Sequence, residues 1–321
     1  MIRILPDSTR PFTLRTALTL AARAWIAASL AWLAIWLLRG DSVPYLGYAN
    51  AGAYLIGLAL IPAIAIALWG RHWLWAAAGA GLLAFLFWTG SGLNIGAGEG
   101  PKAPGSLRIV SASLRSTNPD MAAAAVQVAA YDPDIVILQE ADAIPAFARA
   151  LEAATGTKWQ FAAERSYAAL ARFPVIHLPQ SERDWSEFTI ALPSGPLTVW
   201  NVHAPKSYAR PTENASYFLA LREAVIARHP DLLAGDFNAS PFNYGYRAID
   251  GVMRNAHSTA GFGPGNSFPG GWRRSSVFGA YVRIDHIFAH PAIAIENAFV
   301  GTASRGADHK PIVADVRLPR G

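Results

Sequence analysis

A short polar cluster at the end of an apolar run is the part of the chain best suited to chemistry. From residue 232 to 241 the sequence reads LLAGDFNASP. The apolar residues predict a buried strand that breaks at Gly235 and delivers Asp236 and Asn238 to its carboxyl end, where open α/β sheets bind ligands. A carboxylate and an amide two residues apart suit water activation and phosphate binding. An Asx-stabilised turn would explain a single D-x-N pair equally well.

Four further segments place Asp, Glu or His at the edge of an apolar, β-rich run. They read DPDIVILQE at residues 132–140, VWNVHAP at 199–205, RIDHIF at 283–288 and ADHKPIV at 307–313. A single polar strand end is most simply a turn. Five of them in one chain favour a shared site.

Taken in chain order, the five segments resemble the endonuclease/exonuclease/phosphatase superfamily. Its members include DNase I-like nucleases, abasic-site endonucleases, neutral sphingomyelinases and inositol-phosphate 5-phosphatases. The similarity covers residues 107–318, and the ordered set is specific although no single motif is. The resemblance implies an α/β (α+β) fold, a two-sheet β-sandwich flanked by helices, and a metal-dependent hydrolase of phosphoester bonds.

Two acidic residues are the metal ligands that the resemblance implies. Glu140 matches the Glu that binds the metal in the family, and Asp308 is expected close to the same ion. Carboxylate oxygens are hard ligands that suit Mg²⁺ or Mn²⁺. The number of ions stays open. Asp134 and Gln139 are expected to be structural or to support the ligands.

The resemblance also implies five catalytic residues. Asp236 is the candidate for orienting or deprotonating water, and Asn238 for holding His309 or a phosphate oxygen. His309 would stabilise the transition state, while Asp285 would fix the orientation and charge of that imidazole. His203 would donate to a phosphate oxygen or protonate the leaving oxygen. The division of acid and base roles between Asp236 and His309 stays open.

One position departs from the family pattern. Ser113 ends the first predicted strand, where the family usually has an Asn that supports the metal-binding Glu. A hydroxyl has fewer hydrogen-bond donors than an amide. We therefore expect a change in metal affinity rather than an inactive enzyme. The departure also motivates an alternative function, a catalytically weak, membrane-anchored binding or scaffold protein that retains the fold. The joint presence of the other site residues favours the enzyme.

Candidate substrate contacts lie in two loops. Lys206 and Arg210, with Tyr208 between them, follow the second motif, whereas Trp272 and Arg273 lie in a Gly/Pro-rich loop before the fourth. Either set would suit an anionic cleft, and exposed loop cations are an equally good explanation. Trp272 would also suit contact with lipid. The substrate class stays open between nucleic acid, a phospholipid headgroup and a soluble phosphate ester.

Periodic segments must position these side chains. Helical patterns cover residues 119–131, 144–154 and 211–228, and strand patterns cover 108–114, 135–138, 197–202, 232–234, 283–290 and 311–316. Strands and helices mixed in this way favour a sandwich flanked by helices. We therefore expect a catalytic domain at residues 107–321, preceded by a flexible Gly/Pro-rich linker at 90–106 and a membrane domain at 1–89.

The first 89 residues have the composition of a membrane domain. They contain seven of the 11 Trp residues and apolar segments at about 17–38, 52–69 and 73–88. Each is near the roughly 20 residues that cross a bilayer, so we expect three transmembrane helices that contact the lipid bilayer. Arg3, Arg10 and Arg15 then place the amino terminus in the cytoplasm. This topology predicts a multi-pass inner (plasma) membrane protein with a periplasmic catalytic domain.

The charge of the chain says little about its partner. The formal net charge is +5, of which residues 101–321 carry only +2. A nearly balanced domain argues against strong non-specific binding to duplex DNA, because such binding requires many cations opposite phosphates. The chain has no Cys, which fits either side of a membrane.

Overall fold

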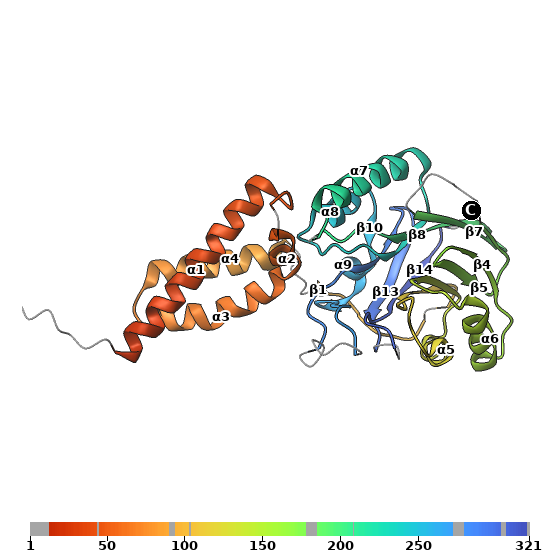
Figure 1. Cartoon of the computed structure of the whole chain (residues 1–321), viewed down its shortest axis with the longest axis horizontal. Helices are drawn as coiled ribbons and strands as arrows, with labels where there is room; N and C mark the ends of the chain where they lie inside the picture. The colour runs from red at the N-terminus through yellow and green to blue at the C-terminus, as the bar shows by residue number, and fades with distance from the viewer. Residues whose placement is uncertain are drawn as a thin grey trace, which may run out of the picture.

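The computed structural model describes residues 13–43, 45–89, 94–102, 104–177, 185–207, 209–271, 279–302 and 306–319. These residues form a helical unit at the amino-terminal side and a larger α/β domain (Figure 1). Three residues proposed as substrate contacts, Tyr208, Trp272 and Arg273, lie outside the described residues.

Two six-stranded sheets form the α/β domain, which confirms the expected two-sheet sandwich. The first sheet has the order β13 (Ala294–Val300), β14 (Ile312–Arg317), β2 (Leu107–Ser113), β3 (Ile135–Gln139), β5 (Tyr167–Ala171) and β4 (Gln160–Glu164). The second has the order β10 (Arg254–Asn255), β12 (Asp285–Ala289), β9 (Leu232–Asp236), β8 (Gly195–His203), β7 (Trp185–Leu192) and β6 (Val175–His177). In each sheet one central pair is parallel, β2 with β3 and β8 with β9, so both sheets present carboxyl ends of strands.

An apolar core fills the space between the sheets, where alternate residues of facing strands point inward. Ile137, Phe188, Val199 and Ile287 belong to this core. The outer face of the first sheet is covered by α5 (Met121–Ala129) and α6 (Ile144–Thr155), and that of the second by α7 (Pro211–Arg228) and α8 (Tyr244–Asp250). A short helix, α9 (Ala256–Ala260), packs on β13, and a two-stranded sheet joins β1 (Asn94–Ile95) to β11 (Phe262–Gly263).

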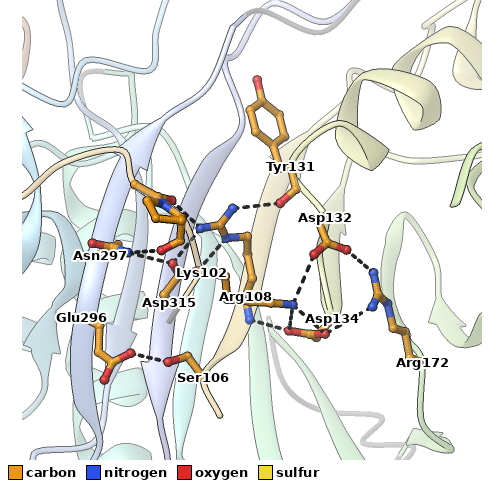
Figure 2. Close-up of polar contacts among 12 residues, drawn as sticks. Lys102, Ser106, Arg108, Tyr131, Asp132, Asp134, Arg172, Glu296, Asn297 and Asp315 are labelled. Atoms are coloured by element: carbon orange, nitrogen blue, oxygen red, sulfur yellow. Dashed lines mark hydrogen bonds and ion pairs between the residues drawn. The ribbon is translucent and has the colours of Figure 1, made fainter. Parts of the chain in front are cut away.

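Buried and half-buried ion pairs tie the amino ends of β2 and β3 to neighbouring strands and loops (Figure 2). Arg108 Nε lies 2.6 Å from Asp315 Oδ1, and Arg108 Nη2 lies 2.7 Å from Asp315 Oδ2. Asp134 accepts hydrogen bonds from the Arg108 backbone N–H at 2.8 Å and from Lys102 Nζ at 2.9 Å. Arg108 Nη2 also donates to the Gly100 carbonyl oxygen at 2.8 Å, so the segment predicted as a linker lies against the sheet there.

The strand before Asp236 does not break at Gly235, contrary to the sequence-based expectation. β9 runs through Gly235 to Asp236, and Gly235 has a φ of 147°. A Cβ at this position would lie 2.0 Å from the Val202 carbonyl oxygen of the neighbouring parallel strand. Glycine is therefore required because β8 approaches closely, and the strand itself carries Asp236 into the site.

The amino-terminal unit consists of α1 (Leu14–Arg39), α2 (Leu46–Ala51), α3 (Ala53–Trp69) and α4 (Trp73–Trp88). Among the described helices only α1, with 26 residues, is long and apolar enough to cross a membrane. The helices α3 and α4 have 17 and 16 residues. At about 1.5 Å per residue they are shorter than the roughly 30 Å hydrocarbon core. The expectation of three transmembrane helices is therefore wrong. The one helix fits a membrane anchor and, near the amino terminus, also fits a signal sequence.

Buried polar contacts join the helical unit to the α/β domain. Trp36 Nε1 donates to the Phe242 carbonyl oxygen at 2.8 Å, and the two rings lie 5.4 Å apart. The Asp41 carboxylate accepts hydrogen bonds from Asn243 Nδ2 at 3.1 Å and from the Tyr244 backbone N–H at 2.5 Å. These contacts attach the helical unit to the loop that directly follows Asp236 and Asn238.

Candidate active site

The sequence-predicted site residues come from both sheets and meet at one edge of the sandwich. His203 and Asp236 are register partners at the carboxyl ends of the parallel strands β8 and β9, and Asp285 lies opposite Asp236 at the start of β12. Glu140 follows β3, and His309 precedes β14. The edge therefore collects five side chains that are up to 169 positions apart in the chain.

A histidine between two carboxylates occupies the deepest part of this edge. His309 Nδ1 lies 2.9 Å from Asp285 Oδ2, within hydrogen-bond distance, and His309 Nε2 lies 3.8 Å from Asp236 Oδ2. All three side chains are buried. Phe268 packs on the imidazole, with ring centroids 4.9 Å apart. Since Asp285 engages one ring nitrogen, the other is held toward Asp236.

A second histidine faces the same carboxylate from the more exposed side of the site. His203 Nε2 lies 3.4 Å from Glu140 Oε1 and 3.8 Å from Asp236 Oδ2. The Glu140 side chain keeps 31% of its surface exposed, compared with 3% for Asp236. The cluster therefore has a buried interior at Asp236 and an accessible rim at Glu140 and His203.

Asn238 fixes the orientation of Asp236. Its backbone N–H donates to Asp236 Oδ1 at 2.8 Å, and its Nδ2 donates to Asp236 Oδ2 at 3.2 Å and to the Ala204 carbonyl oxygen at 2.9 Å. These two bonds engage both protons of the amide, so the side chain contacts Asp236 rather than His309. Of the two roles expected for Asn238, these contacts support neither directly; the amide instead supports the Asp236 carboxylate.

Two non-glycine residues of the site adopt left-handed backbone conformations. Glu140 has a φ of 51° and Asn238 has a φ of 46°. Asn tolerates this region because its short side chain bonds locally, whereas Glu does so at a cost of about 1–3 kcal/mol. In both cases the conformation turns the chain directly after a strand. Strain of this kind is typical of residues whose side chains must be aimed at a site.

Burial and neighbouring charges shift the pKa values of Asp236 and His309. Burial, together with the neighbouring Asp285 carboxylate, raises the pKa of Asp236 to about 6, although His309 and His203 oppose the shift. Burial alone would lower the pKa of His309, but the carboxylates of Asp285 and Asp236 raise it to about 10. At neutral pH, His309 is therefore an imidazolium and Asp236 is a carboxylate close to its pKa.

The residue next to Asp285 has no part in this cluster. His286 is 1% exposed, and its Nε2 lies 2.8 Å from the Ala239 carbonyl oxygen. Its ring packs against Phe237 and Tyr246 at centroid distances of 5.4 and 4.8 Å. The alternation of side chains along β12 sends it to the opposite face of the sheet, where it is a core residue.

The first parallel pair brings Ser113 beside the glutamate motif. Ser113 is the register partner of Gln139, which directly precedes Glu140. Ser113 is 2% exposed, and its Oγ has no hydrogen-bond partner among the described residues. Gln139 Nε2 instead donates to Asn201 Oδ1 at 2.8 Å in the core between the sheets. The serine therefore leaves an unsatisfied buried hydroxyl at the position where the family usually has an amide.

A cleft of about 600 Å³ opens over the cluster. Its lining includes Glu140, Asp236, Asn238, Asp308 and His309, and also Lys206, one of the predicted substrate contacts. A neighbouring cavity of about 810 Å³ is lined by His203, Lys206 and Arg210, among others. Arg210 Nη1 lies 3.2 Å from Glu213 Oε2 on an exposed surface, and Arg210 is not among the residues that line the cleft over Asp236.

Sequence reasoning missed several residues that line the cleft. Arg115 adds a cation two residues after Ser113, and Phe268 and Tyr281 add aromatic surface. The helical unit contributes Tyr48 and Leu55, which lie 84 and 77 positions before the start of the first site motif at residue 132. The position of Arg115 directly after a strand was a usable signal. Nothing in the local sequence marks Tyr48 or Leu55.

The donor set fits a hard divalent cation. Glu140, Asp236 and Asp308 offer carboxylate oxygens to the same cleft. Asp236, Asp285 and His309 also have potential ligand atoms within 4.8 Å of one another, which makes them a candidate metal cluster. Because Asp285 and His309 already face each other at hydrogen-bond distance, we regard Glu140 and Asp308 as the better ligands and that pair as a dyad beside the ion.

The profile of the Endonuclease/Exonuclease/phosphatase family matches residues 92–309. The chain belongs to this family. Members of the family are hydrolases of phosphoester bonds and generally use a divalent metal ion. No curated protein matches the sequence.

Solved structures share the fold of the α/β domain. A family protein from Leptotrichia buccalis is 15% identical, with a TM-score of 0.51, and the match covers 66% of this chain and all of that one. A family protein from Bacteroides vulgatus is 17% identical, with a TM-score of 0.50, 67% of this chain and 99% of that chain being covered. TDP2 from D. rerio, in complex with a single-strand DNA product, is 15% identical, with a TM-score of 0.51 over 66% of this chain and 99% of that one. At these identities the likeness concerns the fold alone.

Proposed function

We propose that this protein is a membrane-anchored, divalent-metal-dependent phosphoester hydrolase, most simply a phosphodiesterase. One observation carries the proposal. A buried carboxylate, Asp236, lies 3.8 Å from each of two histidines at the floor of a cleft, and one of these histidines is backed by a second carboxylate. Groups with shifted pKa values in a cleft are typical of acid–base chemistry.

The geometry supports a division of roles between Asp236 and His309. Asp236 has its pKa raised to about 6, so at neutral pH it is ionised and basic enough to take a proton from an attacking water. His309 has its pKa raised to about 10, so it is protonated and cannot act as the base. Its Nε2–H instead donates to a phosphate oxygen and stabilises the negative charge that develops there.

His203 and the acidic rim complete the arrangement. His203 lies at the exposed side of Asp236, where it is suited to donate to the leaving oxygen. Glu140 and Asp308 would hold the metal ion. When bound, the ion supplies charge neutralisation at the phosphate. Asn238 keeps the Asp236 carboxylate oriented, and Asp285 keeps the His309 imidazole oriented and charged.

A substrate panel tests the proposal. The full chain would be assayed against bis(p-nitrophenyl) phosphate, single- and double-stranded DNA, RNA, phospholipids and inositol phosphates, each with Mg²⁺, Mn²⁺, Ca²⁺ or EDTA. We expect turnover that requires the metal. The unsatisfied hydroxyl of Ser113 motivates the alternative of a catalytically weak binding or scaffold protein. If no substrate of the panel is hydrolysed in a metal-dependent way, that result would favour the alternative.

The helical unit supports the proposed membrane anchor. Large apolar side chains are exposed on it, among them Leu38 at 82%, Leu74 at 86% and Trp88 at 89%. Only 28% of the most apolar window of α1 is buried, which is too little for the core helix of a soluble domain. In a bilayer these apolar surfaces would contact lipid, so the free-energy cost of exposing them to water would not arise.

The distribution of arginines supports an extracytoplasmic α/β domain. Arg15 Nη2 donates to the Trp69 carbonyl oxygen at 2.9 Å, so the start of α1 lies beside the end of α3, next to Arg71. The α/β domain contacts the opposite end of α1, at Trp36. The cationic end is expected to remain in the cytoplasm. A reporter that works only outside the cytoplasm, fused after Gly321, should therefore be active. Activity of a cytoplasmic reporter at that position would reverse the orientation.

A further inference from the structure

The cleft over the catalytic cluster has two chemically different walls. One wall carries the carboxylates and His309. The other comes from the helical unit and consists of Tyr48 and Ala51 on α2, Gly52, and Leu55 on α3. Tyr48 and Leu55 are 55% and 43% exposed, so their side chains present uncovered surface to the cleft. A ligand that fills the cleft touches polar groups on one side and apolar groups on the other.

Buried polar contacts fix the apolar wall in place. The Asp41 carboxylate accepts from Asn50 Nδ2 at 2.5 Å within the helical unit, and from Asn243 Nδ2 at 3.1 Å across the junction. Ser240 Oγ donates to the Asn50 carbonyl oxygen at 3.2 Å. Asp41 is 8% exposed and Asn50 and Asn243 are fully buried. The wall is therefore part of the folded site, since moving it would remove the donors that Asn243 and Tyr244 provide to a buried carboxylate.

The apolar wall continues along the helix that carries it. Leu55, Leu58 and Ile61 follow one another at successive turns of α3 and are 43%, 44% and 53% exposed. We call these three exposed apolar residues the stripe on α3; Leu55 lines the cleft, and α3 runs from there away from the α/β domain (Figure 1). A hydrocarbon chain leaving the cleft would find a continuous apolar surface there.

The charge of the cleft does not suit a long polyanion. Arg115, Lys206 and the imidazolium of His309 are the cations among its described lining, and Glu140, Asp236 and Asp308 are acidic, so the cations do not outnumber the carboxylates. Binding of a nucleic acid strand relies on several cations opposite successive phosphates. A single phosphate beside an apolar chain matches this lining better.

We infer that the substrate is a lipid phosphoester whose phosphate lies at the carboxylate wall and whose hydrocarbon chain lies against Tyr48, Leu55 and the stripe on α3. The inference rests on the proposed function and narrows its substrate class. The helical unit then has two roles, as an anchor and as half of the substrate site.

Two esters that share one phosphodiester test the inference. Dioleoylphosphatidylglycerol and its deacylated form, glycerophosphoglycerol, would be compared in the same detergent with the full chain. We expect the ratio of kcat/KM, acylated over deacylated, to exceed about tenfold, and Leu55→Asn to lower this ratio by about tenfold because a buried Leu side chain contributes on that scale. Leu55→Ala, which adds no polar group, should lower the ratio in the same direction.

Leu68→Asn is the matched control, because Leu68 is 41% exposed at the far end of the same helix and does not line the cleft. For Leu68→Asn, the ratio of kcat/KM for the acylated over the deacylated ester should equal that of the wild type. Hydrolysis of both esters at equal efficiency, a ratio unaffected by both Leu55 variants, or a preference for an oligonucleotide would overturn the inference while leaving the hydrolase intact. Absence of hydrolysis of these esters and of bis(p-nitrophenyl) phosphate would instead remove the proposed function and the inference with it.

Discussion

The two ends of the central strands hold buried carboxylates under opposite electrostatic conditions. At the amino end of β2, Asp315 is paired with Arg108, and Asp134 with Lys102 (Figure 2). At the carboxyl ends, Asp236 and Asp285 share one imidazolium, and the pKa of Asp236 is raised by burial. At the first end each carboxylate is matched by a cation, which suits a structural contact. At the second end the two carboxylates outnumber the His309 cation, which suits the proposed acid–base role.

The largest effect on turnover is expected at Asp236. Asp236→Asn keeps the shape of the side chain but removes the base, so kcat should fall by about 10² to 10⁴. Steady-state kinetics on the best substrate of the panel would measure the loss. Activity within tenfold of the wild type would mean that another group takes the proton.

Asp236→Asn should also stabilise the fold. Substitutions at the amino end of β2, where each buried carboxylate is paired with a cation (the paired end), should destabilise it. The pKa of Asp236 is about 6 when folded and near 3.8 when unfolded, so ionisation opposes folding at higher pH. The gain in Tm of Asp236→Asn should be largest above pH 6 and disappear below about pH 4. Thermal unfolding of the metal-free protein across this range would reveal it. A loss of Tm at pH 7 would contradict the proposed excess of negative charge.

Glu140→Ala tests the accessible rim of the cluster at the carboxyl ends of the strands, where carboxylates outnumber cations. As a proposed metal ligand, Glu140 should be needed for turnover, and its loss should reduce kcat/KM at least about 100-fold at ordinary metal concentrations. Calorimetric titration with Mn²⁺ should show weakened binding. Wild-type affinity for the ion would remove Glu140 from the ligand set. Glu296→Ala offers a matched control, since Glu296 pairs with Arg317 at the other end of the sheets.

Asp285→Asn should have a smaller and pH-dependent effect. The Asp285 carboxylate contributes to the raised pKa of His309, about 10, so its loss lowers that pKa and moves the alkaline limb of the pH–rate profile to lower pH. We expect kcat to fall by about tenfold at neutral pH, which is less than the roughly 10²- to 10⁴-fold contribution of a group that transfers the proton itself. His309→Ala should cost at least as much. The double mutant should be no worse than His309→Ala, and additive losses would show that the two residues act independently.

The smallest effect on turnover is expected at the paired end. Arg108→Met leaves Asp315, which is fully buried, without its main cation, and should lower the free energy of unfolding by about 3 kcal/mol. Turnover below the unfolding temperature should stay within about twofold of the wild type, because rates at the site do not depend on this pair. Adding Asp315→Leu should recover part of the stability. A loss of turnover without a loss of stability would show that the Arg108–Asp315 pair affects the rate at the candidate active site.

Local sequence patterns predicted many of the elements. The helical pattern at residues 211–228 coincides with α7, and the strand patterns at 135–138 and 232–234 lie within β3 and β9. These segments are long or strongly apolar, so local periodicity decides their structure. The pattern gave no strand signal for β4, β5, β6, β7, β10 and β13 of the two large sheets. It also placed three helices across a bilayer where the length of α3 and α4 supports only α1.

The sequence by itself determined which residues can do chemistry, because residue type and the end of an apolar run are local properties. Glu140, His203, Asp236, Asp285 and His309 were identifiable in this way, and their roles remain proposals. Only the tertiary structure decided their distances, the shifted pKa of Asp236 and the apolar wall of the cleft. Those features arise from contacts such as that of Asp41 with Asn243, which are 202 positions apart, and such contacts leave no trace in local periodicity.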